Sequence, residues 1–246
     1  MDKLLYVAAS GARQVMDAQA VNANNLANAT TTGFQADLAA ARAHALEGQV
    51  FPSRVYAESQ PGGTDFAKGA IQPTGRDLDV AVDGQGWIAV QAPDGGEAYT
   101  RAGNLRISPT GMLETGAGHP VMGEGGPMLL PDAQKVEIAP DGTVSMLPVG
   151  QDATVLAVIG RVKVVNPDPT QLQKDENGLL RMRDGGQAPA SNEVKLVSGA
   201  LENSNVNMVD AMTTMIGLSR QFEANIKLME TARENDSASA QLMRIS

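Results

Sequence analysis

The chain has 246 residues, of which 42% are hydrophobic and 3% aromatic, and its formal net charge is -9. This composition excludes a wholly disordered chain and suits one large or two small domains with a mainly aliphatic core. The absence of cysteine excludes disulfides, thiol nucleophiles and cysteine metal sites. Lysine and arginine do not cluster as they do in proteins that bind nucleic acid, so no nucleic-acid partner is expected.

Proline and glycine divide the chain into three parts. All 13 prolines lie between Pro52 and Pro189, and 24 of the 26 glycines lie between Gly33 and Gly199. Because both residues interrupt helices, we expect a long helix at each end and β-structure between them. The predicted fold class is α+β, with long N- and C-terminal helices that pair as a coiled-coil-like stalk and a central antiparallel β-rich domain. The expected parts are residues 1–46, 47–200 and 201–246.

The first predicted helix covers residues 4–28 and mixes alanines with larger apolar residues such as Leu4, Leu5 and Leu26. It should end in the three threonines before Gly33, because β-branched residues and glycine are poor helix formers. Residues 34–46 are alanine-rich and are expected to form a second, short helix. The opening apolar run is too short for a secretory signal, and no apolar stretch of about 18 residues occurs, so no membrane span is expected.

Four asparagines lie near the end of the first helix, at positions Asn22, Asn24, Asn25 and Asn28. Asparagine is a mediocre helix former, so this cluster weakens the helix without a local gain. A buried polar side chain in a helical seam fixes the register of the partner. We interpret the cluster as one that specifies which neighbour docks, and simple surface exposure is the alternative.

Residues 47–199 alternate between apolar and polar with the period of a β-strand. In the clearest case, residues 77–83, Leu78, Val80 and Val82 should face the core and the carboxylates between them the solvent. Further strands are expected at residues 155–165 and 193–197. Tight antiparallel turns are predicted at Asp83-Gly84, Asp94-Gly95, Asp141-Gly142, Asn177-Gly178 and Asp184-Gly185.

The last predicted helix begins near Val206, after the possible capping residues at positions 203–205. The apolar residues of the last segment, residues 201–246, follow spacings of 7, 4, 3, 7, 4 and 3, which is typical of a coiled-coil seam. They are Leu201, Met208, Met212, Met215, Phe222, Ile226 and Met229. A seam needs a partner, and the first helix is the obvious candidate.

No catalytic, cofactor or metal site is expected. Residues 84–89 match the G-x-G-x-x-A pattern of dinucleotide-binding proteins, but the following residues indicate a strand instead of a helix, so we interpret the segment as a hairpin. The aspartates of residues 77–83 fail as a calcium loop, because Ala81 and Val90 stand where oxygen ligands are needed. His44 and His119 have no neighbouring metal ligands.

Three parts of the chain resemble the signatures of bacterial flagellar axial proteins, the rod and hook group. The first is Asn24-Asn25-Leu26-Ala27-Asn28 followed by Thr31-Thr32-Gly33-Phe34. The second covers residues 78–87, 99–104 and 111–113, and the third covers residues 199–206. Within this group, residues 1–6, 76–81 and 120–127 are most similar to proximal rod proteins. Distal rod proteins are the close alternative, but they usually open differently and have a longer segment after the first helix.

The resemblance implies a structural subunit without enzymatic activity, exported unfolded through the flagellar type III apparatus into the periplasmic rod of the basal body. There it would assemble with other proximal rod subunits and the distal rod protein into a shaft that transmits torque and encloses a channel. The terminal helices would form an inner tube, with the β domain outside. The candidate interface residues are Leu4, Leu5, Asn22, Asn24, Asn25, Leu26, Asn28, Met208, Met212, Met215, Phe222, Ile226 and Met229. In a free subunit these helices should be largely disordered.

Two other classes of protein are alternatives. An envelope enzyme acting on peptidoglycan would need converging carboxylates or a nucleophile pair, and the sequence indicates neither. A surface-binding module could also carry a β domain on a stalk. The absence of a cleavable signal and the flagellar signatures argue against it.

Overall fold

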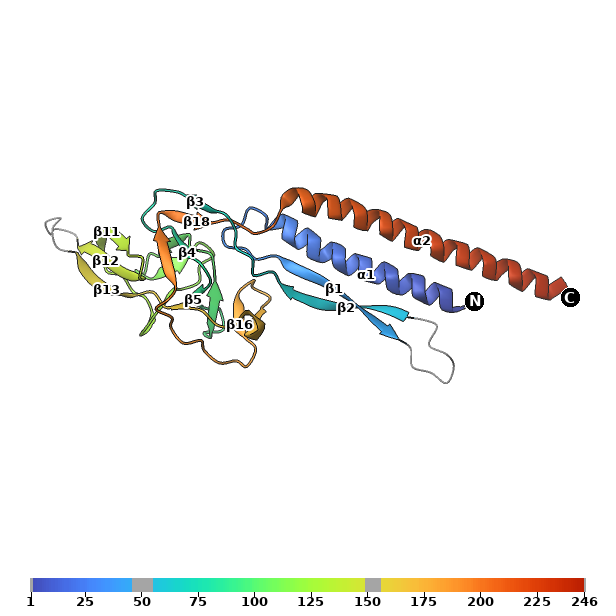
Figure 1. Ribbon diagram of the computed structural model, residues 1–246, viewed down its shortest axis with the longest axis horizontal. Coiled ribbons are helices and arrows are strands. Elements are labelled where there is room, and N and C mark those ends of the chain that lie inside the picture. The colour runs from blue at the N-terminus through green and yellow to red at the C-terminus, as the bar shows by residue number, and fades with distance from the viewer. Residues whose placement is uncertain (1, 46–54, 149–155, 246) are drawn as a thin grey trace. The chain divides into compact units, whose positions relative to one another are not determined.

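The computed structural model describes residues 2–45, 55–148 and 156–245 (Figure 1). The chain divides into two compact units. Unit 1 comprises Met1–Ala29, Asp37–Asp65 and Val206–Ser246, and unit 2 comprises Thr30–Ala36 and Phe66–Asn205. The α+β class predicted from the sequence is confirmed, because two long helices flank a strand-rich middle.

Unit 1 consists of two helices and a β-hairpin. The helices are α1 (Asp2–Ala27) and α2 (Met208–Ile245), and the strands are β1 (Asp37–Ala45) and β2 (Val55–Thr64). Helix α1 contacts α2 and both strands of the hairpin, so it lies at the centre of this unit (Figure 1). The strands are antiparallel, with a register shift between Asp37 and Ala39.

The short helix predicted for residues 34–46 is wrong, because Asp37–Ala45 forms β1. Alanine favours a helix intrinsically, but this preference amounts to less than about 1 kcal/mol per residue and tertiary pairing overrides it. Here β1 pairs with β2 along its whole length. The hairpin therefore groups with the helices, and unit 2 resumes at Phe66 instead of near residue 47, where the sequence analysis placed the boundary.

Unit 2 is built from small antiparallel sheets, and every strand pair in the described ranges is antiparallel, as predicted. The largest sheet has the order β14-β5-β6-β16-β15. Its strands are β5 (Trp87–Gln91), β6 (Glu97–Thr100), β14 (Val164–Val165), β15 (Leu172–Lys174) and β16 (Leu180–Met182). The 3-10 helix η1 (Pro169–Gln171) precedes β15.

A three-stranded sheet and four strand pairs complete unit 2. The sheet contains β11 (Ala133–Ile138), β12 (Thr143–Pro148) and β13 (Ala157–Arg161). The pairs are β3 (Ile71–Pro73) with β18 (Ala200–Glu202), β4 (Val80–Asp83) with β17 (Lys195–Ser198), β7 (Leu105–Ile107) with β8 (Leu113–Thr115), and β9 (Met122–Gly123) with β10 (Gly126–Pro127).

Strand β5 joins the two hydrophobic clusters of unit 2. Ile88 and Val90 belong to a large aliphatic cluster, whereas Trp87 and Ala89 belong to a smaller one that includes Tyr99. Successive side chains of a strand point to opposite faces, so β5 is buried on both. The core is mainly aliphatic, as the composition predicts.

Two predictions for the start of unit 2 are wrong. Residues 84–89 do not close a hairpin, because β4 pairs with β17 and β5 pairs with β6 and β14. The carbonyl oxygens of Gly84 and Gly86 instead accept hydrogen bonds from the Arg101 guanidinium. Asp79 was expected to face solvent, but it is buried and accepts a hydrogen bond from the Thr74 hydroxyl at 2.8 Å.

Of the other predicted turns, Asp94-Gly95, Asp141-Gly142 and Asn177-Gly178 lie between strands that pair with each other. Asp184-Gly185 follows β16, and the next strand along the chain, β17, pairs with β4. A turn dipeptide therefore indicates where the chain reverses, but it does not determine which strands become neighbours.

Candidate assembly interface

The contact between α1 and α2 uses one face of each helix. One hydrogen bond and one close approach define it: the Asn22 side-chain amide donates to the Ala211 carbonyl at 2.7 Å, and Gly11 faces the Asn225 side chain, which an added Cβ atom would meet at 3.5 Å. Asn22 follows Gly11 along α1, whereas Ala211 precedes Asn225 along α2. The two helices therefore run antiparallel.

The face of α2 that meets α1 has a regular spacing. The residues of lowest exposure along α2 alternate in steps of four and three, and they include Ala211 and Asn225 of the contacts above. We call this set the α2 seam: Ala211, Met215, Leu218, Phe222, Asn225, Met229 and Ala232. On α1, the buried apolar residues are Ala8, Ala12 and Val15, at 4–6% exposed. Both helices therefore bury mainly small side chains.

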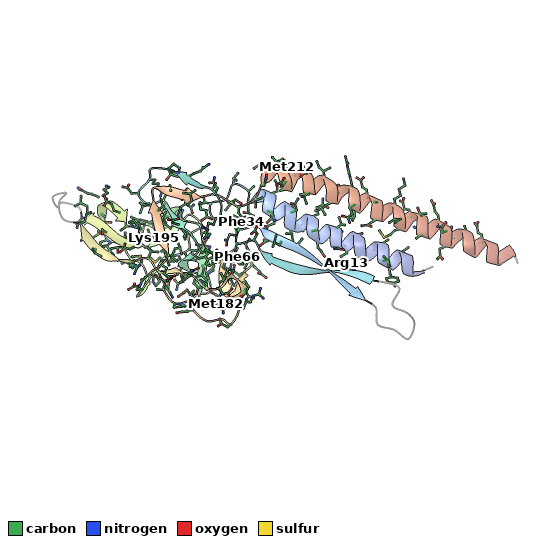
Figure 2. All side chains as sticks on the ribbon, in the orientation of Figure 1. Arg13, Phe34, Phe66, Met182, Lys195 and Met212 are labelled. Carbon is green, nitrogen blue, oxygen red and sulfur yellow. The ribbon has the colours of Figure 1, made fainter. Side chains whose placement is uncertain are left out.

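The predicted interface residues of α2 fall on two different faces. Met215, Phe222 and Met229 are half-buried in the α2 seam. Met208 and Met212, by contrast, are 40% and 49% exposed. Met212 is labelled in Figure 2.

Ile226, at 36% exposed, shares this open side of α2 with Met208 and Met212. Leu201, which the sequence analysis placed in the seam, lies in β18. The helix starts later than expected because Asn207 caps it, accepting a hydrogen bond from the Val209 amide at 3.0 Å.

The predicted leucines of α1 do not form one patch. Leu5 is 39% exposed, and Leu26 is half-buried. Leu4 lies within α1, but its side chain is outside the described part of the chain, as is that of His44 in β1.

The four asparagines of α1 have separate contacts. Asn22 reaches α2, as described above. Asn25 binds the backbone of Asp37 twice, accepting from its amide and donating to its carbonyl, both at 2.8 Å. Asn28 donates to the Asn24 carbonyl at 2.9 Å, near the end of the helix. Asn25 therefore fixes the start of β1, whereas Asn28 and Asn24 close the end of α1.

In unit 2, the segment Thr30–Ala36 is held by backbone contacts to residues 202–205. The Gly33 amide donates to the Glu202 carbonyl at 2.8 Å, and the Ala36 amide donates to the Asn205 side chain at 2.8 Å. The Asn205 amide donates in return to the Phe34 carbonyl at 3.2 Å. Two of the three signature segments are therefore hydrogen-bonded to each other.

Side chains of the large sheet hold the same segment. The Trp87 indole donates to the Gln35 side chain at 3.2 Å. Lys174 donates to the Gln35 carbonyl at 2.8 Å, and its ammonium lies 4.0 Å from the centre of the Phe34 ring. Phe66 packs edge-on against Trp87 at 5.8 Å between ring centres. Figure 2 labels Phe34 and Phe66.

A buried ion pair lies beneath this segment. Arg101 Nη1 is 2.8 and 2.9 Å from the two carboxylate oxygens of Glu202, and both side chains are 2% exposed. The Gly69 amide also donates to Glu202 at 2.9 Å. With the carbonyls of Gly84 and Gly86, the pair is closely surrounded by partners, as a buried pair must be.

This pair was not predicted from the sequence. Arg101 and Glu202 each lie inside a signature segment, and this position could have marked them as important residues. The pairing itself, between residues about one hundred positions apart, needed the fold.

Other charged side chains of unit 2 bind one another. Tyr99 donates to Glu97 at 2.9 Å, and Glu97 also accepts two hydrogen bonds from Lys163 at 2.8 Å. Burial raises the pKa of the Tyr99 hydroxyl. The hydrogen bond from Arg181 lowers the pKa of Asp94, on the surface of the same sheet.

Within residues 2–45, 55–148 and 156–245, no three histidine, aspartate or glutamate side chains gather closely enough to hold a metal ion. None of the helices in these same ranges is long and apolar enough to cross a membrane.

Three family models match the chain in separate regions. They are "Flagella basal body rod protein" over residues 5–35, "Flagellar hook protein FlgE/F/G D1 domain" over residues 81–146, and "Flagellar basal body rod FlgEFG protein C-terminal" over residues 197–242. Together they define the class as flagellar rod and hook proteins. The outer two include most of α1 and α2, and the middle one begins in β4 and ends in β12.

Individual relatives match along the whole length. The chain is 41% identical to the flagellar basal-body rod proteins FlgF of Salmonella typhimurium and Escherichia coli, over 100% of each sequence. It is 35% identical to FlgG of Bacillus subtilis, over 95% of the chain and 96% of that protein. The chain belongs to the flagellar basal-body rod protein family.

Proposed function

We propose that this chain is a structural subunit of the proximal rod of the flagellar basal body. The observation that carries the proposal is the similarity to FlgF proteins over the full length of both sequences. The subunit self-assembles with further rod proteins, including the distal rod protein, into a tubular shaft. This shaft transmits torque, encloses the export channel and lies in the periplasm, which the subunit reaches through the type III export apparatus.

In this proposal the terminal helices pair as a coiled coil. The alternating steps of four and three along the α2 seam support it, because this spacing keeps one stripe facing a partner helix. The Asn22 hydrogen bond to the Ala211 carbonyl favours one register over others. Some candidate interface residues, such as Met215, then contact α1 within the chain. Others, such as Met212, are left for contacts with neighbouring subunits.

The subunit acts without catalysis in this proposal. The charged groups that are buried in unit 2 already bind one another, as Arg101 binds Glu202 and Lys163 binds Glu97. These ion pairs hold together the segments that carry them. Because each charged group is paired inside the chain, its burial needs no substrate to explain it.

Deleting the gene in its parent bacterium, with plasmid complementation as control, tests the proposal. Loss of hooks and motility with the inner-membrane rings retained would support an essential rod subunit. Intact, motile flagella would overturn it.

The distal rod is a second candidate position, favoured by the 35% identity to a FlgG protein. Complementation of two deletion strains, one lacking FlgF and one lacking FlgG, distinguishes the proximal from the distal position. A chain that restores motility only to a strain lacking FlgF belongs to the proximal position, whereas restoration of a strain lacking FlgG would assign it to the distal one.

A further inference from the structure

Asn177 and Gly178 form the only Asn-Gly dipeptide of the chain. They lie in the turn between β15 and β16, and both residues are exposed. Within the described part of the chain, no hydrogen bond holds the side-chain amide of Asn177. A Cβ atom added to Gly178 would have no other atom within 4 Å, so the surroundings of the dipeptide are open.

Asp175 closes the turn that contains this dipeptide. Its carbonyl accepts a hydrogen bond from the Gly178 amide at 3.0 Å. Its carboxylate Oδ1 accepts from the Asn177 and Leu179 amides, both at 2.9 Å. The other carboxylate oxygen accepts from Arg181 Nε at 3.1 Å. These hydrogen bonds all end on one residue, so Asp175 keeps the turn closed.

An asparagine followed by glycine is chemically labile in water. The glycine nitrogen attacks the carbonyl carbon of the asparagine side chain, its proton passes to water, and the side-chain nitrogen leaves as ammonia. Water then opens the cyclic imide at one of its two carbonyl groups, which gives aspartate or isoaspartate. The whole reaction consumes water and releases ammonia, without an oxidant or a cofactor. Glycine favours it because no Cβ atom restricts its backbone.

We infer that Asn177 is a site of deamidation and that Asp175, as a positioning residue, controls its rate. In the closed turn the Gly178 amide is hydrogen-bonded to the Asp175 carbonyl, and this bond breaks before the Gly178 nitrogen turns toward the Asn177 side chain. The reaction therefore passes through an opened turn, and its rate follows the population of that state. This property goes beyond the proposed rod function and does not depend on it.

Conversion to isoaspartate would loosen the hairpin of β15 and β16. The backbone then runs through the side-chain methylene, so it is longer than the turn closed by Asp175 allows. The next residues, Leu179 and Leu180, are buried in the two hydrophobic clusters of unit 2. Leu180 also pairs with Tyr99 of β6, and β16 lies between β6 and β15 in the large sheet. A loosened β16 would leave β6 as an exposed edge strand.

Peptide mapping by mass spectrometry measures the conversion of each asparagine in the purified full chain after ageing in mildly alkaline buffer. We expect Asn177 to convert faster than Asn203, which is followed by Ser204. Urea should speed the conversion of Asn177, because it opens the turn. The Asn177 peptide should contain isoaspartate besides aspartate, since both come from the same imide.

Removal of the Asp175 carboxylate tests its control of the rate. Asp175→Ala should speed the conversion of Asn177 about tenfold, because the amide hydrogen bonds to the carboxylate are lost. The matched control is Asp141→Ala, since the Asp141 carboxylate accepts from the Thr143 amide at 3.0 Å in another hairpin turn. This control should leave the rate at Asn177 unchanged. Fluorescence of the buried Trp87 verifies that unit 2 is folded.

If Asp175→Ala does not fold, Asp175→Asn takes its place. Its side-chain oxygen still accepts a hydrogen bond but has no charge, so it should speed the conversion by less. The inference is overturned if Asn177 converts no faster than Asn203, if urea has no effect, or if no isoaspartate forms. It is also overturned if the folded Asp175 variant converts at the natural rate, or if Asp141→Ala speeds the conversion equally.

Asn177→Asp separates the effect of charge from that of the longer backbone. This variant has the new carboxylate on a normal backbone, so its urea midpoint should stay close to that of the natural chain. The isoaspartate fraction of the aged chain, separated by ion exchange, should unfold at a lower urea concentration. Equal midpoints for all three proteins would overturn the loosening of β16.

Discussion

Arg101 and Glu202 form a bidentate ion pair in which both side chains are 2% exposed. The pair connects the residue after β6 with the last residue of β18. Its remaining polar atoms bind backbone groups, including the Gly69 amide and the Gly84 carbonyl. Removing one partner would leave a charge buried without compensation, which costs more than the pair itself contributes.

Glu202→Gln should therefore lower the free energy of unfolding of unit 2 by about 3–5 kcal/mol. Urea unfolding of the full chain measures it, with fluorescence of Trp87 as the signal, since this only tryptophan is buried in unit 2. The matched control is Glu137→Gln. Glu137 pairs with Lys135 at the surface, so its loss should cost less than about 1 kcal/mol. Similar losses for the two variants would contradict the importance of the buried pair.

Gly33→Ala should destabilise unit 2 for two reasons. The backbone at Gly33 has a positive φ, which alanine rarely adopts, and no space is left for a Cβ atom. Gly33 has a φ of 67°, and an added Cβ would lie 2.2 Å from the Arg101 carbonyl carbon. Gly185 has a φ of 73° but open space around its Cβ position, so Gly185→Ala measures the conformational cost alone, about 1–2 kcal/mol. The same urea titration should show a clearly larger loss for Gly33→Ala. Equal losses would mean that the segment at residue 33 moves aside at no cost.

The helices were the most predictable part of the fold. The sequence predicts the first helix over residues 4–28, and α1 covers Asp2–Ala27. Breaker residues locate such helices because their effect is local. The strand β1 was missed, since its alanines carry a local helix preference and its pairing with β2 involves residues further along the chain.

The helix contact was only partly predictable for a related reason. The predicted seam is made mainly of large residues, but the methionines of α2 are spread over two faces of the helix. Met215 and Met229 lie in the α2 seam, whereas Met212 lies on the open side of α2. The small members of the seam, Ala211 and Ala232, carry no strong signal on their own. Their role becomes visible only when the partner helix is in place.

Met215→Asp should block assembly while unit 2 stays folded. The change places an unpaired charge in the half-buried α2 seam, where a desolvated carboxylate is costly. Complementation of the deletion strain measures assembly, and Trp87 fluorescence of the purified variant measures the state of unit 2. Thr213→Asp is the control, because Thr213 is exposed and lies outside the α2 seam. Normal incorporation of the Met215 variant would count against the seam.

Asp94 should contribute stability only above acidic pH. The Arg181 hydrogen bond lowers its pKa in the folded chain, so its contribution is complete above the ordinary aspartate value of about 4 and is lost as pH falls through the lowered value. Asp94→Asn should therefore lower the urea midpoint at about pH 7 and lower it by less at about pH 2. The shift should be small because the pair is exposed. An equal shift at both pH values would rule out the charge as its cause.

The terminal helices should exchange their amide hydrogens quickly in a free subunit. The two helices bury mostly small residues, such as Ala8 and Ala12 of α1 and Ala211 of α2, so the packing energy available to them is modest. Hydrogen exchange followed by mass spectrometry on a verified monomer measures this. We expect low protection over residues 4–28 and 206–243 and high protection in β5, which is buried on both faces. Assembly into the proposed rod should then protect the helices, because neighbouring subunits would cover side chains that one chain leaves exposed, such as Met212 and Ile226. Full protection of both helices in the monomer would show that the contact within one chain is sufficient to order them.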